Sequence, residues 1–209
     1  MTPAQSRALD ELLPHYGLQS EAGEFDFPRI FGRDAQRTLE IGFGNGDTLL
    51  ELAQLHPDRD FIGIEVHRPG IGRLLNALAH AALDNVRVVC VDAVQILDRC
   101  VPDASLDAVL LYFPDPWPKK RHHKRRIVQP EFATLVAHKL KPGGSFQLAT
   151  DWPDYAEHML EVLSACPDFS NLAGSGAYVA RPAERPLTRF ERRGLKRGHP
   201  VHDLAFARR

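Results

Sequence analysis

Short, almost continuously apolar runs alternate along the chain with stretches whose apolar residues recur every three or four positions. The runs predict strands at 37–42, 61–66, 86–91, 106–113 and 145–151. The stretches between them predict helices at 48–56, 67–83, 93–100, 131–140 and 153–165. Continuous apolar strands, each followed by an amphipathic helix, are typical of a parallel sheet that is covered on both faces. The pattern therefore predicts a doubly wound, mostly parallel α/β fold.

The two ends of the chain differ from this alternating centre. A helix is expected at 3–17 and a turn-rich segment at 25–29. Beyond residue 166 the sequence is irregular and basic until 202–208, which predicts an antiparallel edge strand. No linker divides the chain, so we expect one domain over 1–209. Its parts are an N-terminal segment (1–35), a cofactor-binding core (36–166) and a basic tail (167–209).

Composition excludes several classes of protein. The 209 residues are 44% hydrophobic and 25% charged, as in an average globular domain. No apolar run approaches the roughly 18 residues of a membrane helix, and the start lacks the pattern of a signal peptide. Cys90, Cys100 and Cys166 are odd in number and irregularly spaced, which indicates neither a disulfide framework nor a zinc site. We expect a cytoplasmic protein without membrane association or metal.

The net charge of -1 conceals an asymmetry between the halves of the chain. Residues 1–118 hold 9 Lys+Arg against 18 Asp+Glu, whereas residues 119–209 hold 17 against 9. The positive charge gathers at 119–126 (KKRHHKRR) and again in the tail from 181 to 209. Such local clusters are compatible with a polyanionic partner despite the near-neutral net charge.

The first predicted strand runs into a glycine-rich turn, EIGFGNG (40–46). Gly42, Gly44 and Gly46 allow the backbone to turn sharply and to approach a ligand. Their G-x-G-x-G spacing differs from the dinucleotide pattern G-x-G-x-x-G, and Glu40 is unfavourable beside a pyrophosphate. Glu40 instead suits a cationic amino-acid end, such as the methionine part of S-adenosylmethionine. The alternative is a tight turn without a ligand.

Two more acids follow the next two strands. Glu65 ends the second strand, where a carboxylate can accept both hydrogen bonds of a ribose diol. Asp92 follows the third strand, where it can accept from an adenine amino group. Either acid alone is better explained as a solvated strand end, but together with Glu40 they predict a nucleoside-binding set at one edge of the sheet.

The fourth predicted strand leads into a stiff loop, FPDPWPKK (113–120). Three prolines within five residues restrict the backbone and hold Asp115 beside the predicted cofactor site. The basic cluster follows directly, and with Trp117 it predicts phosphate contacts combined with stacking. The residues assigned to RNA phosphates are Lys120, Arg121, Lys124, Arg125 and Arg126. The adjacent His122 and His123 do not share a face, so they indicate RNA contact or surface rather than metal.

Five segments carry a resemblance to a known family. EIGFGNG, FIGIEVH, FPDPWPKKRHHKRRIV, ATDWPDYAEHMLEVL and RPLTRFERRG together resemble the tRNA (guanine-N7-)-methyltransferase family of the bacterial single-chain type, over residues 37–209. The glycine motif is shared by many methyltransferases. The PDPWPKKRHHKRR segment and the RP-x-T-x-FE-x-RG tail are specific to this family.

The resemblance implies an activity and a set of site residues. It implies methyl transfer from S-adenosylmethionine, leaving S-adenosylhomocysteine, to the variable-loop guanosine at position 46 of tRNA. It implies that Glu40, Glu65 and Asp92 hold the cofactor and that Asp115 is the active-site acid beside cofactor and base. Lys119, Asp151, Thr188, Arg189, Phe190 and Glu191 would face the tRNA. We expect no obligate protein partner, and a monomer rather than a homodimer.

The chemistry of guanine agrees with this interpretation. N7 already carries an in-plane lone pair, so no general base is needed and placement is the main requirement. A carboxylate only accepts hydrogen bonds and can take both donors of the Watson–Crick edge, N1–H and the 2-amino group. We expect Asp115 or Asp151 to hold that edge, after the base is unstacked from the tRNA. Trp117 or Phe190 could then stack on the base. The alternative is that both are core aromatics, and for Phe190 the two interpretations are equally favoured.

Three other functions fit parts of the sequence. A methyltransferase acting on another base atom, such as an exocyclic amine, also places an acid and prolines after the fourth strand. An RNA-binding protein of the same fold without catalysis is a second alternative, disfavoured by the intact acids Glu40, Glu65, Asp92 and Asp115. An NAD oxidoreductase is disfavoured by the glycine spacing.

Overall fold

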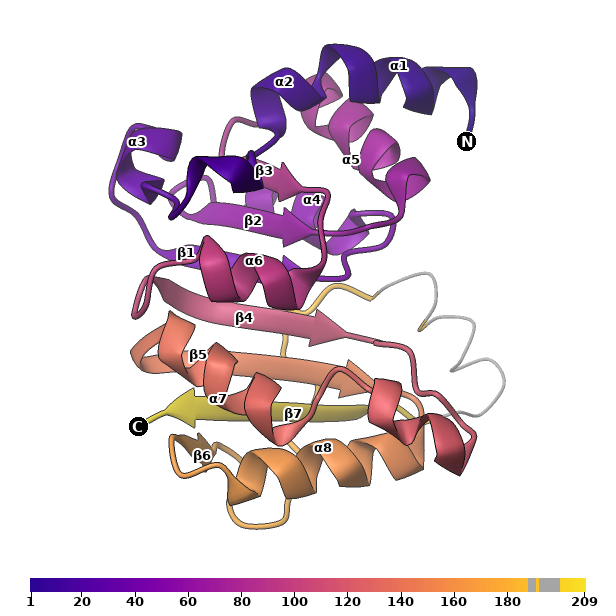
Figure 1. The fold of residues 1–209 in the computed structure, drawn as a ribbon, viewed down its shortest axis with the longest axis vertical. Coiled ribbons are helices and arrows are strands. Elements are labelled where there is room, and N and C mark those ends of the chain that lie inside the picture. The colour runs from indigo at the N-terminus through magenta and orange to yellow at the C-terminus, as the bar shows by residue number, and fades with distance from the viewer. Residues whose placement is uncertain (188–190, 192–199) are drawn as a thin grey trace.

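A single mixed sheet organises the protein. The computed structural model describes residues 1–187, 191 and 200–209, and over these residues it has seven strands in the order β3-β2-β1-β4-β5-β7-β6 (Figure 1). The strands are β1 (Arg37–Ile41), β2 (Asp60–Ile64), β3 (Val86–Val89), β4 (Leu106–Tyr112), β5 (Leu140–Thr150), β6 (Phe169–Asn171) and β7 (His202–Arg208). Strands β1 to β5 are parallel, and β7 is antiparallel to both of its neighbours. The predicted doubly wound, mostly parallel fold is confirmed.

Helices cover both faces of the sheet. They are α1 (Pro3–Glu11), α2 (Leu13–Tyr16), α3 (Phe27–Phe31), α4 (Asp47–Leu55), α5 (Arg68–His80), α6 (Ala93–Arg99), α7 (Pro130–Lys139) and α8 (Pro153–Ala165), with short 3-10 helices η1 (Ser20–Ala22) and η2 (Lys120–Arg125). Helices α6, α7 and α8 lie in front of the sheet in Figure 1. None of the helices in the described part of the chain has the length and apolar character needed to cross a bilayer.

Alternation along each strand divides the core into two apolar layers. Leu39 and Ile41 of β1 join the cluster that contains α6, α7 and α8. Leu110 and Tyr112 of β4 join the opposite cluster, with α1, α4 and α5. Since successive side chains of a strand point to opposite faces, strands β2, β3, β4 and β5 supply residues to both layers. This explains why the central strands read as continuous apolar runs.

The C-terminal strand differs from the prediction in its place. Residues 202–208 do form an antiparallel strand, but β7 lies between β5 and β6, and β6 is the outermost strand. Leu204 and Phe206 of β7 are buried in the apolar layer that contains α8. The three residues of β6 lie in the segment that the sequence indicated as irregular, because so short a strand shows no alternation.

The N-terminal segment also departs from the expected single helix and turn. Pro14 has no backbone N–H and interrupts helical hydrogen bonding, so residues 3–16 form the two helices α1 and α2. The segment expected to be turn-rich contains α3, whose first turn is capped by Asp26 through the backbone N–H of Arg29 at 3.2 Å. Helix α1 packs on α5 so closely that a Cβ on Gly72 would lie 2.5 Å from the carbonyl oxygen of Gln5.

Candidate functional site

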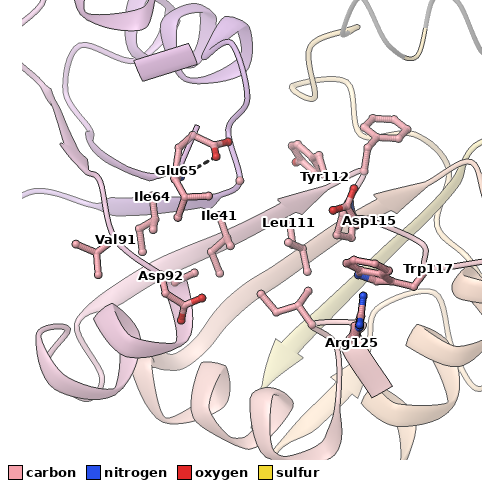
Figure 2. A pocket seen from close by; sticks show the side chains of 16 residues that line it. Ile41, Ile64, Glu65, Val91, Asp92, Leu111, Tyr112, Asp115, Trp117 and Arg125 are labelled. Carbon is pink, nitrogen blue, oxygen red and sulfur yellow. Dashed lines mark hydrogen bonds between the residues drawn. The ribbon is translucent and has the colours of Figure 1, made fainter. Parts of the chain in front are cut away.

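A cleft of about 360 Å³ lies at the carboxyl ends of the parallel strands, a size within the range of small-molecule sites. Figure 2 shows Glu65 and Asp92 on one side of the cleft, and Asp115, Trp117 and Arg125 on the other. The space between these groups is apolar and is lined by Ile41, Ile64, Val91 and Leu111. The sequence places these groups on four different strand ends, and the parallel sheet brings them to one edge.

The glycine turn after β1 takes the conformation for which its glycines are suited. Gly42, Gly44 and Gly46 have φ of 70°, 58° and 77°, values that favour glycine over other residues. A Cβ on Gly46 would lie 2.7 Å from the side chain of Leu74, whereas one on Gly42 would meet nothing within 4 Å. Of the three, Gly42 lines the cleft. The backbone there is therefore open to a ligand.

Three backbone hydrogen bonds fix the carboxylate of Glu65. Its Oε2 accepts from the N–H of Gly44 at 2.8 Å, and its Oε1 accepts from the N–H groups of Val66 at 2.7 Å and His67 at 2.9 Å. An ionised carboxylate has about four acceptor positions. Glu65 thus ties the glycine turn to the start of α5 and retains about one position for a ligand hydroxyl, fewer than the two expected for a ribose diol.

Asp92 caps helix α6 and also faces the cleft. Its Oδ1 accepts from the backbone N–H of Gln95 at 3.1 Å and so caps α6. The side chain is exposed and lines the cleft. One carboxylate oxygen is thus engaged by the helix, and Oδ2 is the oxygen placed to accept from a ligand donor.

The carboxyl group of Glu40 is buried in the sheet. Its side chain is 4% exposed, does not line the cleft, and points away from the layer occupied by its neighbour Ile41. Its Oε2 has no hydrogen-bond partner among the described residues. Burial, and secondly the charge of Glu65, raises the pKa of Glu40 to about 8. The carboxyl group is therefore mostly protonated at neutral pH.

The loop carrying Asp115 has an unusual backbone. Asp115 is exposed and lies between two residues with positive φ, Phe113 at 53° and Trp117 at 45°. Residues other than glycine rarely adopt positive φ. The guanidinium of Arg125 lies 5.0 Å from the centre of the Trp117 ring, and the His122 ring meets the same indole edge-on at 6.0 Å. Trp117 is therefore held by contacts on the rim of the cleft.

The basic cluster divides into outward-facing and inward-facing residues. Lys119, Lys120, Arg121, Lys124 and Arg125 are exposed on η2 and just before it. Arg126 is only 2% exposed, and its guanidinium is bonded to groups inside the protein. The prediction that Arg126 contacts RNA phosphate is therefore corrected, because a guanidinium that is buried and bonded through Nε and Nη2 to Pro116, His123 and Asp154 is not available to a phosphate.

The residues expected to face tRNA from β5 and the tail are only partly described. Asp151 is half-buried directly after β5. Thr188, Arg189 and Phe190 lie outside the described residues. Glu191 is 2% exposed and belongs to a buried ion pair, which contradicts its expected place at the tRNA surface.

The partner of Glu191 is Arg185, which the sequence did not single out. Its Nη1 and Nη2 donate to Glu191 Oε2 and Oε1 at 2.6 and 2.7 Å, and Nη2 also donates to Asp203 Oδ2 at 3.1 Å. The guanidinium lies 5.7 Å from the ring centre of Tyr112 and 5.8 Å from that of Phe113. The RP-x-T-x-FE pattern could have drawn attention to Arg185, but nothing in it indicates a buried pair.

Comparison with known proteins identifies the family. The model of a family described as "Putative methyltransferase" matches residues 34–204. The tRNA (guanine-N(7)-)-methyltransferase of Ectopseudomonas mendocina is 59% identical over 208 residues, which cover 100% of this chain and 87% of that protein. The protein of the same name from Pseudomonas aeruginosa (strain UCBPP-PA14) is 60% identical over 208 residues, with coverage of 100% and 85%.

Solved structures agree on the fold. The crystal structure of the 16S rRNA methyltransferase KamB superposes with a TM-score of 0.66 at 17% identity, and the match covers 88% of this chain and 94% of that chain. The two proteins thus share a fold. Because the chain is about 60% identical to these relatives over nearly its full length, it belongs to the tRNA (guanine-N7-)-methyltransferase family.

Proposed function

We propose that the protein transfers the methyl group of S-adenosylmethionine to N7 of guanosine 46 in the variable loop of tRNA. Membership of the family supports the reaction. The observation that carries the assignment of the site is the cleft itself, where Glu65 and Asp92 lie opposite Asp115, Trp117 and Arg125. One side of the cleft offers hydrogen-bond acceptors for a nucleoside, and the other side offers the carboxylate of Asp115 and the ring of Trp117. This arrangement suits two ligands whose reacting atoms meet between the two sides.

The residues on the first side fit S-adenosylmethionine. The open space beside Gly42 admits a ligand close to the backbone, and Oδ2 of Asp92 and the remaining acceptor position of Glu65 suit an adenine amino group and a ribose hydroxyl. The unpartnered Oε2 of Glu40, at the end of β1 and before the glycine turn, suits the donors of the amino-acid end. When bound, S-adenosylmethionine supplies a methyl group on a positively charged sulfur.

The residues on the opposite side orient the guanine. Asp115, which lines the cleft, or Asp151, which follows β5 outside that lining, accepts hydrogen bonds from N1–H and the 2-amino group. This directs N7 of the same base away from the carboxylate. Trp117 offers a face on which the unstacked base can rest. Because N7 uses its lone pair directly, no residue has to remove a proton, and alignment of the reacting atoms supplies most of the rate enhancement.

The exposed cations bind the tRNA backbone. Lys119, Lys120, Arg121 and Lys124 form a basic surface next to the loop that carries Asp115. Phosphate contacts of this kind fix the orientation of a nucleic acid without reading its sequence. They hold the variable loop where guanosine 46 can enter the cleft.

The proposal is tested with tRNA that carries 7-deazaguanosine at position 46. This nucleoside keeps the Watson–Crick edge but has a carbon–hydrogen group in place of N7. We expect the protein to methylate the unmodified transcript and to bind the 7-deaza transcript with similar affinity, without transferring a methyl group to it. Equal methyl transfer to both transcripts would place the reaction on another atom or another nucleoside.

A further inference from the structure

The loop beside the cleft cannot stabilise itself. Phe113 and Trp117 both adopt positive φ, which is unfavourable for residues that carry a side chain. Three prolines among the residues between and after them lack the backbone N–H with which a loop usually bonds to itself. Asp115 lies in the middle of this segment. Its position therefore depends on contacts from outside residues 113–118.

Arg126 provides such a contact next to Asp115. Its Nε donates to the carbonyl oxygen of Pro116 at 2.9 Å, and its side chain is 1% exposed. Pro116 directly follows Asp115 in the chain, so this bond fixes the peptide adjacent to the acid. A buried hydrogen bond from a charged donor is stronger than one between neutral groups.

The guanidinium of Arg126 is itself held by several groups. Nη2 donates to Oδ2 of Asp154 and, at 3.1 Å, to Nε2 of His123. The central carbon of the guanidinium lies 4.7 Å from the centre of the Tyr155 ring. Asp154 and Tyr155 belong to the first turn of α8, and this helix packs in the core. The bond to Pro116 thus connects the loop to a rigid element.

The chain on either side of Arg126 is fixed in the same way. Nε2 of Gln129 donates to the carbonyl oxygens of His123 and Arg126, both at 3.2 Å. The backbone N–H of Val128 donates to the Tyr155 hydroxyl at 3.4 Å. Arg126 therefore does not move independently of α8, and the geometry it imposes on Pro116 is well defined.

We propose that Arg126 is a positioning residue for the methyl-transfer reaction. Through the carbonyl of Pro116 it holds Asp115 and the Trp117 ring against the cleft, while Asp154, His123 and Tyr155 keep its guanidinium in one orientation. The inference rests on the proposed function in so far as it takes Asp115 to hold the guanine. A lysine retains the charge at this position but lacks the planar set of donors that bonds Pro116, Asp154 and His123 together.

The test uses Trp117 as a reporter of the loop. The sequence contains two tryptophans, so a Trp152→Phe background leaves Trp117 alone. In this background Arg126→Lys is compared with its parent and with Asp154→Asn. Arg99→Lys is the control, because Arg99 is an exposed arginine at the end of α6, outside the cleft lining. The measurements are acrylamide quenching of Trp117, single-turnover methylation of tRNA, and affinities for tRNA and S-adenosylhomocysteine.

We expect Arg126→Lys to increase quenching and to slow single turnover by about tenfold or more, because small displacements of a positioned group are costly in rate. Both affinities should stay within about twofold of the parent, since the lysine variant retains the ligand-binding groups. Asp154→Asn, whose side chain is 60% exposed, should show the same changes to a smaller extent. Arg99→Lys should show none.

Two results would overturn the inference. One is a folded Arg126→Lys variant with parental quenching and rate. The other is a loss of thermal stability and of both affinities in proportion to the rate, which would make Arg126 part of the general fold.

If the lysine variant does not fold, Asp154→Asn decides by the same criteria. A parent that methylates no tRNA would contradict the proposed function instead, and the quenching comparison would still decide whether Arg126 holds the loop.

Discussion

Glu40 is a carboxyl group buried in the sheet with an oxygen that no described residue bonds. Its pKa, raised to about 8 by burial and secondly by Glu65, makes protein stability depend on pH. Between about pH 4.5 and 8 the folded state keeps a proton that the unfolded state has released. The stabilisation that the Glu40 carboxyl group contributes is therefore fully present below the pKa that this group has in the unfolded protein. It is lost as the pH rises through 8, the pKa of the group in the folded protein.

Glu40→Gln should remove this dependence, because glutamine does not ionise. We expect the variant and the parent to differ little at pH 5. At pH 9 the variant should be the more stable by about 2–4 kcal/mol, a magnitude set by the linkage of a raised pKa to stability. Urea unfolding at the two pH values measures the difference. Parallel pH profiles would show that the carboxyl of Glu40 ionises as freely in the folded protein as in the unfolded one.

Asp115→Asn tests the acid of the loop. Asparagine keeps the size but turns one acceptor into a donor, which faces the donors of the guanine edge. We expect single-turnover methylation to fall by about 100-fold while tRNA affinity is retained. Asp151→Asn is the matched comparison, and the substitution with the larger effect identifies the carboxylate that holds the base. An unchanged rate in both variants would remove both acids from this role.

At the residue scale the sequence predicted kinds of side chain better than their directions. It indicated which acids lie at the strand ends, since parallel strands bring these ends together. It did not indicate that Arg126 is buried while Arg125 is exposed at the cleft, because the burial of Arg126 depends on Asp154, 28 residues away in α8. The burial of Glu40 and the engagement of Glu65 by three backbone N–H groups likewise follow from tertiary contacts.

Among the elements, β7 links the end of the chain to the site. Asp203 of β7 is buried with Arg185 and Glu191, beside Tyr112 at the end of β4. This ion pair joins the last strand to the segment that precedes it. The charges are out of water, so each partner depends on the others for its stability.

Glu191→Gln should therefore act on folding rather than on tRNA contact. Glutamine retains one acceptor oxygen but turns an NH2 group toward the guanidinium, so one of the two charge-assisted hydrogen bonds to Arg185 is lost, while Asp203 still balances the charge of Arg185. The free energy of unfolding should fall by about 1.5–3 kcal/mol. Denaturant unfolding measures this decrease. If the variant has parental stability but binds tRNA more weakly, Glu191 contacts the tRNA, as the family resemblance implied.

The parallel strands and the helices between them were predictable because each repeats a long, regular pattern. Helix α8 was predicted over its observed residues, and its proline and acidic first turn mark the start. Strand β6 and helix α3 were not, because three to five residues cannot display a period. The inner position of β7 could not be inferred either, since it requires knowledge of β6.

Over the whole molecule, the charge asymmetry of the sequence has a structural counterpart. The exposed cations of η2 lie beside a cleft whose ligand-facing groups include acids from the first half of the chain. A nucleic acid would thus be attracted to the cations while acids receive the bases. The parts of the site come from four strand ends, and the sheet order brings them together.

Neutralising the outward-facing lysines should change how salt affects tRNA binding. For Lys120→Ala with Lys124→Ala, we expect weaker binding, because fewer phosphates are neutralised in the complex. The slope of log affinity against log salt should become shallower by about 1 for each phosphate that no longer meets a lysine. Filter binding over a series of salt concentrations gives the slope, and Arg99→Ala is the control. A slope equal to that of the parent would show that these lysines face solvent in the complex.

The most direct measurement of the central claim is to map the methyl group on the RNA. The protein is incubated with S-adenosylmethionine and unmodified tRNA, and the RNA is then treated so that it breaks only at N7-methylated guanosine. We predict one break, at position 46 in the variable loop. Methyl transfer without a break would place the reaction on another atom, and tRNA binding without any transfer would contradict the assignment of the cleft as a methyltransferase site.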